Sequence, residues 1–319
     1  MNKSLFSEAA YYKPYTYKGL SGRYIHMPAA TEKAKRTFVI LYGQHATLER
    51  IEPIVKALTR YGDVYAVDNP GFGGMDAAYK IKEHPTLEFY SGHLKHFISE
   101  YIPADRQLTL MGISYGFQII ANTLGEDKEL CSRVEMAISF VGFVSYRDFD
   151  MPLAYSLFLK SFLSNIGHTW LGGKILNMTI RPSILKLSYF IARPNDVKYK
   201  SLNKGEAKNY LSEQTWLWMV NDDRTHAATA RDFWYKNDLT NLRIPVNGVH
   251  IGVPRDHLFR NSVIHEELEV MFQKMTLLEL NLENHAPLDV DTEAKVSELF
   301  PATLKSMFME SRNGKAVSL

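Results

Sequence analysis

The sequence predicts an α/β fold, with a mostly parallel central sheet that helices cover on both faces. Continuous apolar runs, typical of strands buried on both faces, alternate with apolar residues spaced three or four apart, the spacing of one helix face. One of these runs passes through Gly112–Gly116 directly into a helical pattern. A mostly helical stretch then interrupts the alternation, which resumes near residue 243. Alternating strands and helices favour parallel strands, because each crossover returns the chain in the same direction.

The first part of the chain supplies most of the expected sheet. Residues 15–20 and 22–27 alternate between apolar and polar side chains, which predicts two antiparallel strands about the turn Ser21-Gly22. The buried strands that follow are expected over residues 37–42, 64–67, 107–111 and 134–141, and helices over residues 51–58, 87–98 and 117–124. Strand and helix therefore take turns along the chain, as a sheet covered on both faces requires.

The second part of the chain returns to the same pattern after the interruption. Strands are expected over residues 243–251 and 275–280, and helices over residues 263–272 and 296–309. In the interruption, Leu, Phe, Tyr and Trp are frequent, and glycines and prolines break a helical pattern. We therefore expect residues 1–144 and 240–319 to form one α/β core, into which residues 145–239 insert a helical cap.

The composition is that of a globular protein and argues against several classes of function. Of the 319 residues, 45% are apolar, enough for a large core, and the formal net charge is +2. Lysine and arginine are interspersed with acids, so no nucleic-acid partner is expected. The single cysteine, Cys131, excludes an internal disulfide. The first residues lack the apolar region of a signal peptide, and the most apolar stretch, residues 151–166, is too short to span a bilayer. We expect a cytoplasmic protein with no transmembrane segment.

The segment Gly112-Ile113-Ser114-Tyr115-Gly116 has the pattern G-x-S-x-G between a strand and a helix, which is the nucleophile elbow. A serine on so sharp a turn has strained backbone angles and lies close to the chain on both sides, where glycine fits best. The turn exposes the Ser114 hydroxyl above the sheet and points the helix N-terminus at it, where developing negative charge is favoured. Ser114 is therefore the predicted nucleophile.

A serine nucleophile needs a base, and the base needs an acid that fixes its orientation and tautomer. With this elbow, the partners follow in the chain order serine, acid, histidine. Asp256 lies in the loop after the strand ending at Ile251, at the same edge of the sheet as the elbow. His285 follows the last expected strand and precedes the final helix. We predict Asp256 as the acid and His285 as the base, with Asp148 or Asp150, after the preceding strand, as alternative acids.

An acyl-transfer reaction also needs two N–H donors for the oxyanion that develops on the substrate. One is expected from Tyr115, the residue after the nucleophile. The second is expected from the loop after the strand at residues 37–42, where Gly43 permits a close backbone approach and Gln44 supplies the N–H group. The sequence thus predicts an oxyanion hole formed by the backbone of Gln44 and Tyr115.

These motifs resemble those of the α/β-hydrolase fold family, specifically of its members with a helical cap, over nearly the whole chain. The resemblance rests on the elbow, on Asp68–Gly73, which is similar to the family's D-x-P-G-x-G turn, on residues 244–256 and on His285. It implies the same triad as the residues themselves. This chain departs from the family at Tyr42-Gly43, where many members have His-Gly before the oxyanion residue.

The expected function is hydrolysis of a small apolar ester or related acyl substrate by a serine hydrolase, through an acyl-enzyme intermediate. The cap is expected to close a largely apolar cavity over Ser114. No cofactor or metal is expected, because His93 and His96, three apart on a helix, have no accompanying carboxylate pattern. The same scaffold supports carbon–carbon bond hydrolysis, acyl transfer to another acceptor and non-catalytic binding, which are the alternative predictions.

Overall fold

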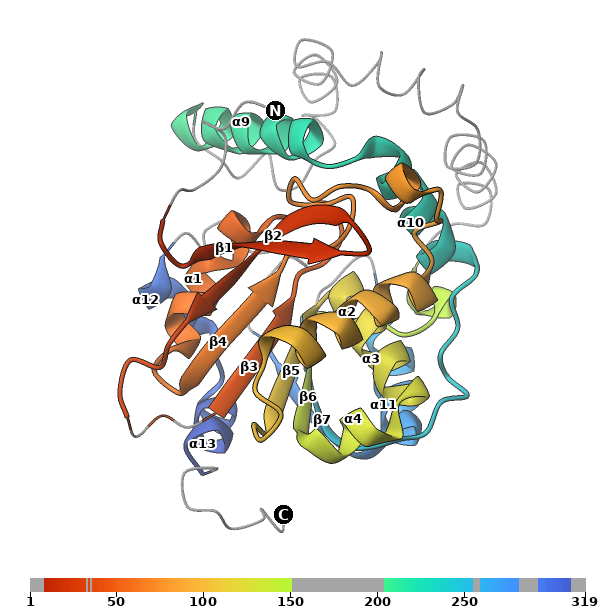
Figure 1. The fold of residues 1–319 in the computed structure, drawn as a ribbon. Coiled ribbons are helices and arrows are strands. Elements are labelled where there is room, and N and C mark those ends of the chain that lie inside the picture. Colours follow the sequence, from red (N-terminus) through yellow and green to blue (C-terminus); the bar gives the residue numbers. More distant parts are fainter. Residues whose placement is uncertain are drawn as a thin grey trace.

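The computed structural model describes residues 9–32, 34, 36–150, 204–254, 259–280 and 292–310. Within them, the strands form a single eight-stranded sheet with the order β1-β2-β4-β3-β5-β6-β7-β8 (Figure 1). The strands are β1 (Tyr12–Tyr17), β2 (Leu20–Met27), β3 (Arg36–Leu41), β4 (Gly62–Val67), β5 (Leu108–Ile113), β6 (Val134–Phe140), β7 (Ile244–Gly252) and β8 (Phe272–Glu279). The pairs β1–β2 and β2–β4 are antiparallel and the remaining pairs are parallel. The predicted α/β fold with a mostly parallel sheet is confirmed.

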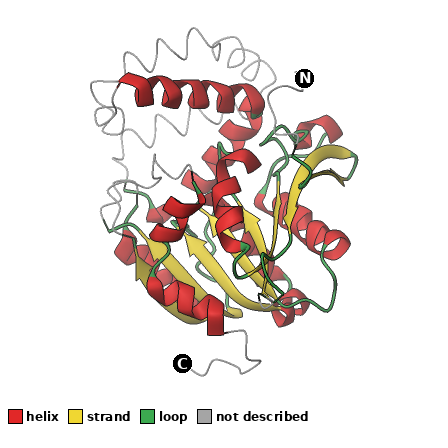
Figure 2. Cartoon of the chain, turned by 90° about the vertical axis from the view of Figure 1, so that its left-hand side faces the viewer, coloured by secondary structure: helices red, strands yellow, loops and turns green. Residues whose placement is uncertain are grey.

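Helices lie on both faces of this sheet (Figures 1 and 2). The described helices are α1 (Leu48–Leu58), α2 (Leu87–Tyr101), α3 (Tyr115–Glu126), α4 (Lys128–Arg133), α9 (Lys204–Val220), α10 (Asp223–Tyr235), α11 (Asn261–Met271), α12 (Glu293–Leu299) and α13 (Ala302–Glu310), with the short 3-10 helices η2 (Ala78–Ile81) and η3 (Tyr146–Asp148). Figure 1 shows α2, α3 and α11 along one side of the sheet and α1, α12 and α13 along the other. This is the layering that alternating crossovers produce.

The predicted cap insertion is described only in part. Residues 151–203, including the apolar stretch 151–166, lie outside the described residues. Helices α9 and α10 belong to the predicted insertion, and Figure 1 shows both at the same end of the molecule, beyond one end of the sheet. The division of the chain into a core and a cap stays a prediction.

The prediction for the first hairpin placed its turn three residues too late. The turn is Lys18-Gly19, with Tyr17 paired to Leu20, whereas Ser21 and Gly22 lie inside β2. Lys18 and Gly19 have φ values of 48° and 82°. Two successive positive φ angles match the right-handed twist of a two-residue hairpin, and glycine adopts them without strain.

Gly22 owes its place in β2 to packing rather than to a turn. A Cβ added there would lie 2.6 Å from Cγ of Met75. The side chain of Met75 therefore packs directly on the backbone of β2. A glycine in a strand often marks such a close approach, and the sequence pattern alone favours the turn instead.

The helix predicted over residues 296–309 is in fact two helices, α12 and α13, which are separated at Phe300-Pro301. Phe300 has an extended backbone with φ −68° and ψ 120°. The residue before a proline is pushed out of the helical region, and α13 begins directly after Pro301. The apolar spacing continued across this break and concealed it.

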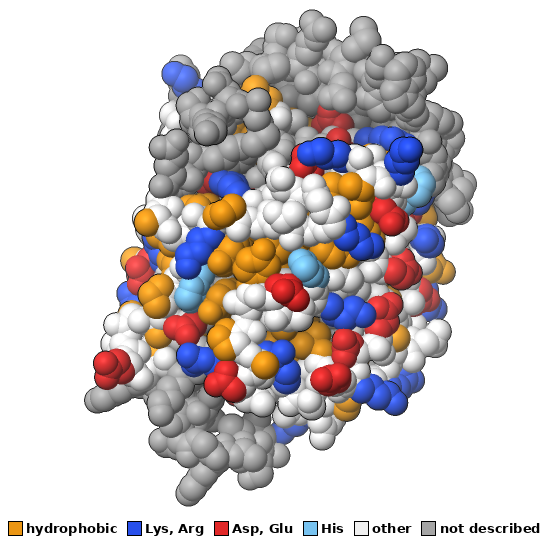
Figure 3. Space-filling model, viewed as in Figure 1, with side chains coloured by type: hydrophobic (Ala, Val, Ile, Leu, Met, Phe, Trp, Pro, Cys, Tyr) orange, Lys and Arg blue, Asp and Glu red, His pale blue; other side chains and the backbone are white. Residues whose placement is uncertain are grey.

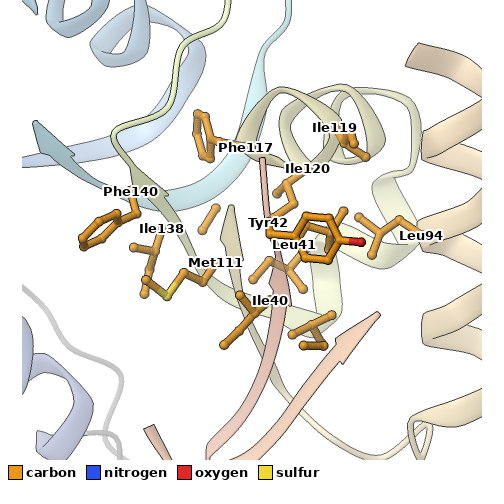
Figure 4. Packing of buried hydrophobic residues seen from close by; sticks show 14 of the residues in the cluster. Ile40, Leu41, Tyr42, Leu94, Met111, Phe117, Ile119, Ile120, Ile138 and Phe140 are labelled. Atoms are coloured by element: carbon orange, nitrogen blue, oxygen red, sulfur yellow. The ribbon is translucent and has the colours of Figure 1, made fainter. Parts of the chain in front are cut away.

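The centre of the core lies in β3, β5 and β6, where side chains from adjacent parallel strands are in register. Ile40 pairs with Met111, and Met111 with Ile138, and all three are fully buried (Figure 4). Burying such a side chain contributes about 1.5–3 kcal/mol. The continuous apolar runs of the sequence therefore mark strands covered on both faces, as predicted.

Arg36 lies at the start of β3, at the end of the sheet opposite the elbow, and binds the C-terminal helix α13 there. Its guanidinium forms an ion pair with Glu135 and donates to Thr109 Oγ1 at 2.9 Å. It also donates to the carbonyl oxygens of Met307 at 2.7 Å and Phe308 at 3.2 Å, in α13. A charged group with this many partners holds α13 in place, because a buried charge is costly unless it is paired.

We expect Arg36→Met to lower the free energy of unfolding by roughly 2–3 kcal/mol, since Glu135 and two helix carbonyls lose a charged donor. Urea unfolding followed by circular dichroism measures this change. Arg106→Met is the matched control, because Arg106 forms only an exposed ion pair with Asp63 at 3.6 Å and should change stability by about 0.5 kcal/mol or less. Equal effects of the two substitutions would contradict the role of Arg36.

Candidate active site

Ser114 lies at the junction of β5 and α3 with a strained backbone. Its φ is 51° and its ψ is −122°. Such angles are sparsely populated for a residue with a side chain and cost about 1–3 kcal/mol. The strain is held in place by hydrogen bonds on both sides: Ser114 N donates to Phe140 O, and Phe117 N donates to Ser114 O, each at 3.0 Å. The turn predicted from G-x-S-x-G is therefore present in the backbone.

The two glycines of the pattern are required by close approach of the chain. A Cβ on Gly112 would lie 2.3 Å from Cα of Phe117, and one on Gly116 would lie 2.3 Å from the carbonyl oxygen of Leu41. Neither neighbour is a flexible side chain. The sharp turn thus packs α3 against the backbone of β3, and the predicted reason for both glycines is confirmed.

The loop that follows β3 lies against Ser114. A Cβ on Gly43 would be 3.0 Å from Cβ and 3.5 Å from Oγ of Ser114, so only a residue without a side chain brings the loop this close. Gln44 and Tyr115 flank this approach in sequence. Their N–H groups as oxyanion donors stay a prediction, and the close approach of Gly43 is the geometry that this prediction needs.

The side chain of Gln44 has a role that the sequence did not indicate. Its Nε2 donates to the carbonyl oxygen of His226 at 2.8 Å and to Oγ1 of Thr229 at 2.6 Å, both in α10. Gln44 thus joins the loop after β3 to a helix about 180 residues later in the chain. No local pattern encodes a contact of this length, so sequence reasoning missed Thr229 and His226.

Tyr42, which stands where many family members have histidine, anchors this loop from below. Its hydroxyl donates to Oδ1 of Asp68 at 2.7 Å and accepts from the N–H group of Asn69 at 3.1 Å. Nδ2 of Asn69 donates in turn to the carbonyl oxygen of Tyr42 at 3.4 Å. The tyrosine therefore joins the end of β3 to the end of β4 through a buried network.

Asp68 is the charged centre of this network. It is fully buried, and Nε of Arg23 donates to its Oδ2 at 3.2 Å. Burial raises the pKa of Asp68 to about 7, against the lowering effects of the Arg23 guanidinium and the Tyr42 hydroxyl. Gly73 folds back over the same carboxylate, because a Cβ there would lie 1.9 Å from Oδ1. The turn Asp68–Gly73 is thus folded around its own aspartate.

The same turn also holds the start of α10. The N–H group of Gly73 donates to Oδ1 of Asn221 at 2.8 Å, and the N–H group of Asp222 donates to the carbonyl oxygen of Gly71 at 2.8 Å. Gly71 has a φ of 86°, and a Cβ there would lie 2.6 Å from the side chain of Thr225. The turn therefore binds the residues just before α10, and the side chain of Gln44 binds α10 further along.

Asp256 and His285, the predicted acid and base, lie outside the described residues. The alternative acid Asp148 is buried, and its Oδ2 accepts from the N–H groups of Val144 at 2.8 Å and Ser145 at 2.9 Å. Burial raises the pKa of Asp148. Asp148 thus caps its own turn after β6. Asp150, the other alternative, is exposed.

A carboxyl group of α11 also faces Asp148. Burial and the charge of Asp148 raise the pKa of Glu267 to about 8. The protonation of each carboxyl group therefore depends on that of the other. The turn after β6 thus holds Oδ2 of Asp148, whereas Oδ1 has no hydrogen-bond partner in the described structure.

The described residues contain no metal site, and the face shown in Figure 3 has no separate basic surface. No group of three or more His, Cys, Asp or Glu side chains in the described part of the chain is arranged to hold a metal ion. His93 is buried against Tyr15 and Tyr17, each with ring centroids 5.3 Å away, and Nε2 of His96 lies 3.3 Å from Thr16 O.

On the face shown in Figure 3, acidic and basic side chains are mixed rather than segregated. None of the described helices is long and apolar enough to cross a bilayer.

Solved structures of hydrolases share this fold. The chain is similar to a hydrolase from Pseudomonas aeruginosa PA01 (TM-score 0.63, 14% identity, covering 97% of this chain and 100% of that chain). It is also similar to an esterase from Exiguobacterium antarcticum (0.62, 16%, 91% and 96%) and to an enol-lactonase from Burkholderia xenovorans LB400 (0.58, 15%, 84% and 91%). No protein-family model and no curated protein matches the sequence. The chain therefore has the α/β-hydrolase fold, as the resemblance implied.

Glycine at position 114 should relieve the backbone strain, whereas alanine should not. We expect Ser114→Gly to be more stable than Ser114→Ala by about 1 kcal/mol, because the relieved strain exceeds the extra chain entropy of glycine. Urea unfolding of the two variants measures the difference. At an ordinary helical position the order is reversed, and Ala121→Gly in α3 should be less stable than the parent chain. A Ser114→Gly variant that is less stable than Ser114→Ala would contradict the strain.

Tyr42→Phe should lower the free energy of unfolding by about 1–3 kcal/mol, since the buried Asp68 carboxyl loses a donor. Burial raises the pKa of Asp68 to about 7 in the folded state. Protonation of Asp68 therefore stabilises the folded protein at low pH, and this stabilisation is lost as the pH rises through about 7. Above that pH Asp68 is ionised, and the loss of the Tyr42 hydroxyl donor costs most. The loss should thus be larger at about pH 8 than at about pH 5.

Tyr15→Phe is the matched control for this prediction, because the buried Tyr15 hydroxyl has no partner in the described structure. Its removal should change stability by about 0.5 kcal/mol or less, or stabilise the protein. A Tyr42→Phe effect that is independent of pH would show that Asp68 does not depend on the tyrosine.

Proposed function

We propose that this protein is a serine hydrolase that cleaves a small apolar ester or a related acyl substrate with Ser114 as the nucleophile. The observation that carries the proposal is the strained backbone of Ser114, which joins β5 to α3 with a φ of 51°. Backbone strain of this size, here between Gly112 and Gly116, is typical of functional sites. The α/β-hydrolase fold and the similarity to an esterase and an enol-lactonase support the same class of reaction.

In the proposed reaction, Oγ of Ser114 attacks the acyl carbon while His285 takes the hydroxyl proton and Asp256 holds the imidazole in the reactive tautomer. The N–H groups of Gln44 and Tyr115 stabilise the oxyanion. The bond from the acyl carbon to the alcohol oxygen then breaks, and His285 returns the proton to the leaving alcohol. Water attacks the acyl-enzyme in the same way and releases the carboxylic acid and free Ser114.

Asp256 is preferred as the acid because the alternatives are less suitable. Asp148 accepts two backbone N–H groups and faces Glu267, so its carboxylate is already committed to the turn after β6. Asp150 is exposed, where an ion-paired imidazole gains little from it. Asp256 follows β7, whose last residues pair with Phe140 beside the elbow. We expect an acid in the loop after β7 at the same end of the sheet as the elbow.

Activity measurements test this proposal directly. The parent protein should react with a fluorophosphonate probe and hydrolyse p-nitrophenyl esters of short acyl chains. Ser114→Ala should abolish labelling and lower kcat by about 10³-fold or more, because a triad acts as a unit. His285→Ala should lower kcat by a similar factor, and Asp256→Asn by about 10⁴-fold through the wrong tautomer. Ser99→Ala, which removes an exposed hydroxyl bonded to the carbonyl of His96, is the control. Unchanged ester hydrolysis by Ser114→Ala would overturn the proposal.

A further inference from the structure

The loop after β3 ends in an aromatic cluster that the proposed reaction does not use. His45, the residue after Gln44, has a φ of 57°. Its ring centroid lies 4.4 Å from that of Trp218 in α9 and 5.1 Å from that of His226 in α10. Trp218 and His226 are themselves 4.8 Å apart. The three rings, which we call the His45 cluster, therefore form one contact group where the catalytic loop meets α9 and α10.

Three nitrogen atoms of this cluster are buried without a partner. Both ring nitrogens of His45 and Nδ1 of His226 have no hydrogen bond in the described structure. More than nine in ten buried polar groups in folded proteins are paired, so an orphan group calls for a ligand or a water. Here two adjacent imidazoles together leave three buried nitrogens without a hydrogen bond. The cluster has the polar atoms of a binding site.

The charge of the cluster indicates the kind of group that it accepts. Burial lowers the pKa of His45 to about 2 and that of His226 to about 4, so both rings are neutral near pH 7. Each neutral imidazole offers one donor and one acceptor. The Arg50 guanidinium also lowers the pKa of His45, but Arg50 pairs with Glu213 at 3.6 Å, so this pair adds no net charge near the cluster. A neutral hydroxyl, which both donates and accepts, fits these groups better than a carboxylate.

The cluster is also close to the predicted reaction centre along the chain. His45 follows Gln44 directly, so their Cα atoms are about 3.8 Å apart. Gln44 is fixed by its side-chain bond to the carbonyl oxygen of His226, and Gly43 lies 3.5 Å from Oγ of Ser114 at the position of its missing Cβ. A group held by the two imidazoles would thus belong to a part of the substrate near the reacting carbonyl. Trp218 offers an apolar face for the adjoining carbon chain.

We propose that His45 and His226 bind a neutral hydroxyl group of the substrate, so that the protein acts on hydroxylated acyl esters. This inference rests on the proposed serine-hydrolase function and narrows its substrate class. The hydroxyl donates to one imidazole and accepts from the other, which satisfies nitrogens that are otherwise unpaired. A site built to hydrogen-bond a hydroxyl discriminates strongly against the analogue without one, since its own polar groups are then left unpaired.

The experiment compares p-nitrophenyl butanoate with its 2-hydroxy and 3-hydroxy analogues. The parent protein should have a kcat/KM at least about tenfold higher for one hydroxylated ester than for butanoate. His226→Phe and His45→Phe should each lower that ratio about tenfold, and His226→Asn, which keeps a polar group near Nδ1, should retain more of it than His226→Phe. His26→Phe is the matched control, because His26 stacks on Tyr65 at 4.2 Å, in the sheet. It should keep the parent ratio.

A binding measurement separates this proposal from the proposed reaction. In Ser114→Ala protein, calorimetry should give a lower Kd for the preferred hydroxylated ester than for butanoate, and adding His226→Phe should remove the difference. This result would stand even if no ester were hydrolysed, in which case the reaction and not the site would be wrong. Equal Kd values and equal kcat/KM values for all three esters would overturn the hydroxyl site. So would a preference that both His45→Phe and His226→Phe leave intact.

Discussion

The strained backbone at Ser114 is the constraint on which the rest of the site depends. A serine with φ 51° and ψ −122° is stable only if the chain around it allows no other path. That condition is met by two glycines that bring α3 into contact with the backbone of β3. It is also met by two hydrogen bonds, one that Ser114 donates to β6 and one that it accepts from α3. The central strands supply the rigidity, because their side chains are fully buried and in register. The packed core therefore also stabilises the strained turn at Ser114.

The network of Tyr42, Asp68 and Arg23 shows how this chain supports the loop after β3. A tyrosine hydroxyl reaches across to Asp68 and also accepts from the backbone of Asn69, so one side chain fixes the ends of β3 and β4 together. Arg23, from the antiparallel hairpin, offsets the buried carboxylate. The loop that carries Gly43 thus rests on three segments of the sheet. The loop after β3 is thus held by a tyrosine hydroxyl and a buried carboxylate.

Local patterns in the sequence were sufficient for the parts of the structure that local physics decides. Buried parallel strands, the elbow at Ser114 and the close approach of Gly43 follow from apolar runs and from glycines placed where the chain crowds. The hairpin turn was misplaced because Gly22 serves packing against Met75, and a strand glycine is indistinguishable in sequence from a turn glycine. The contact of Gln44 with α10 spans about 180 residues and leaves no periodic signal. The predicted acid and base, Asp256 and His285, stay predictions.

Helix α10 connects features that the sequence presents as separate motifs. Its first turn is held by the Asp68–Gly73 segment through Asn221 and Asp222, and its middle is held by the side chain of Gln44. A displacement of α10 would therefore pull on the loop that lies against Ser114 and on the turn folded around Asp68 at the same time. His226 makes the second of these contacts, because its carbonyl oxygen accepts from Gln44, and its ring lies against that of His45. The position of α10 and the geometry of the loop after β3 are therefore coupled. A hydroxyl group that bridges the two imidazoles, as proposed, would fix both.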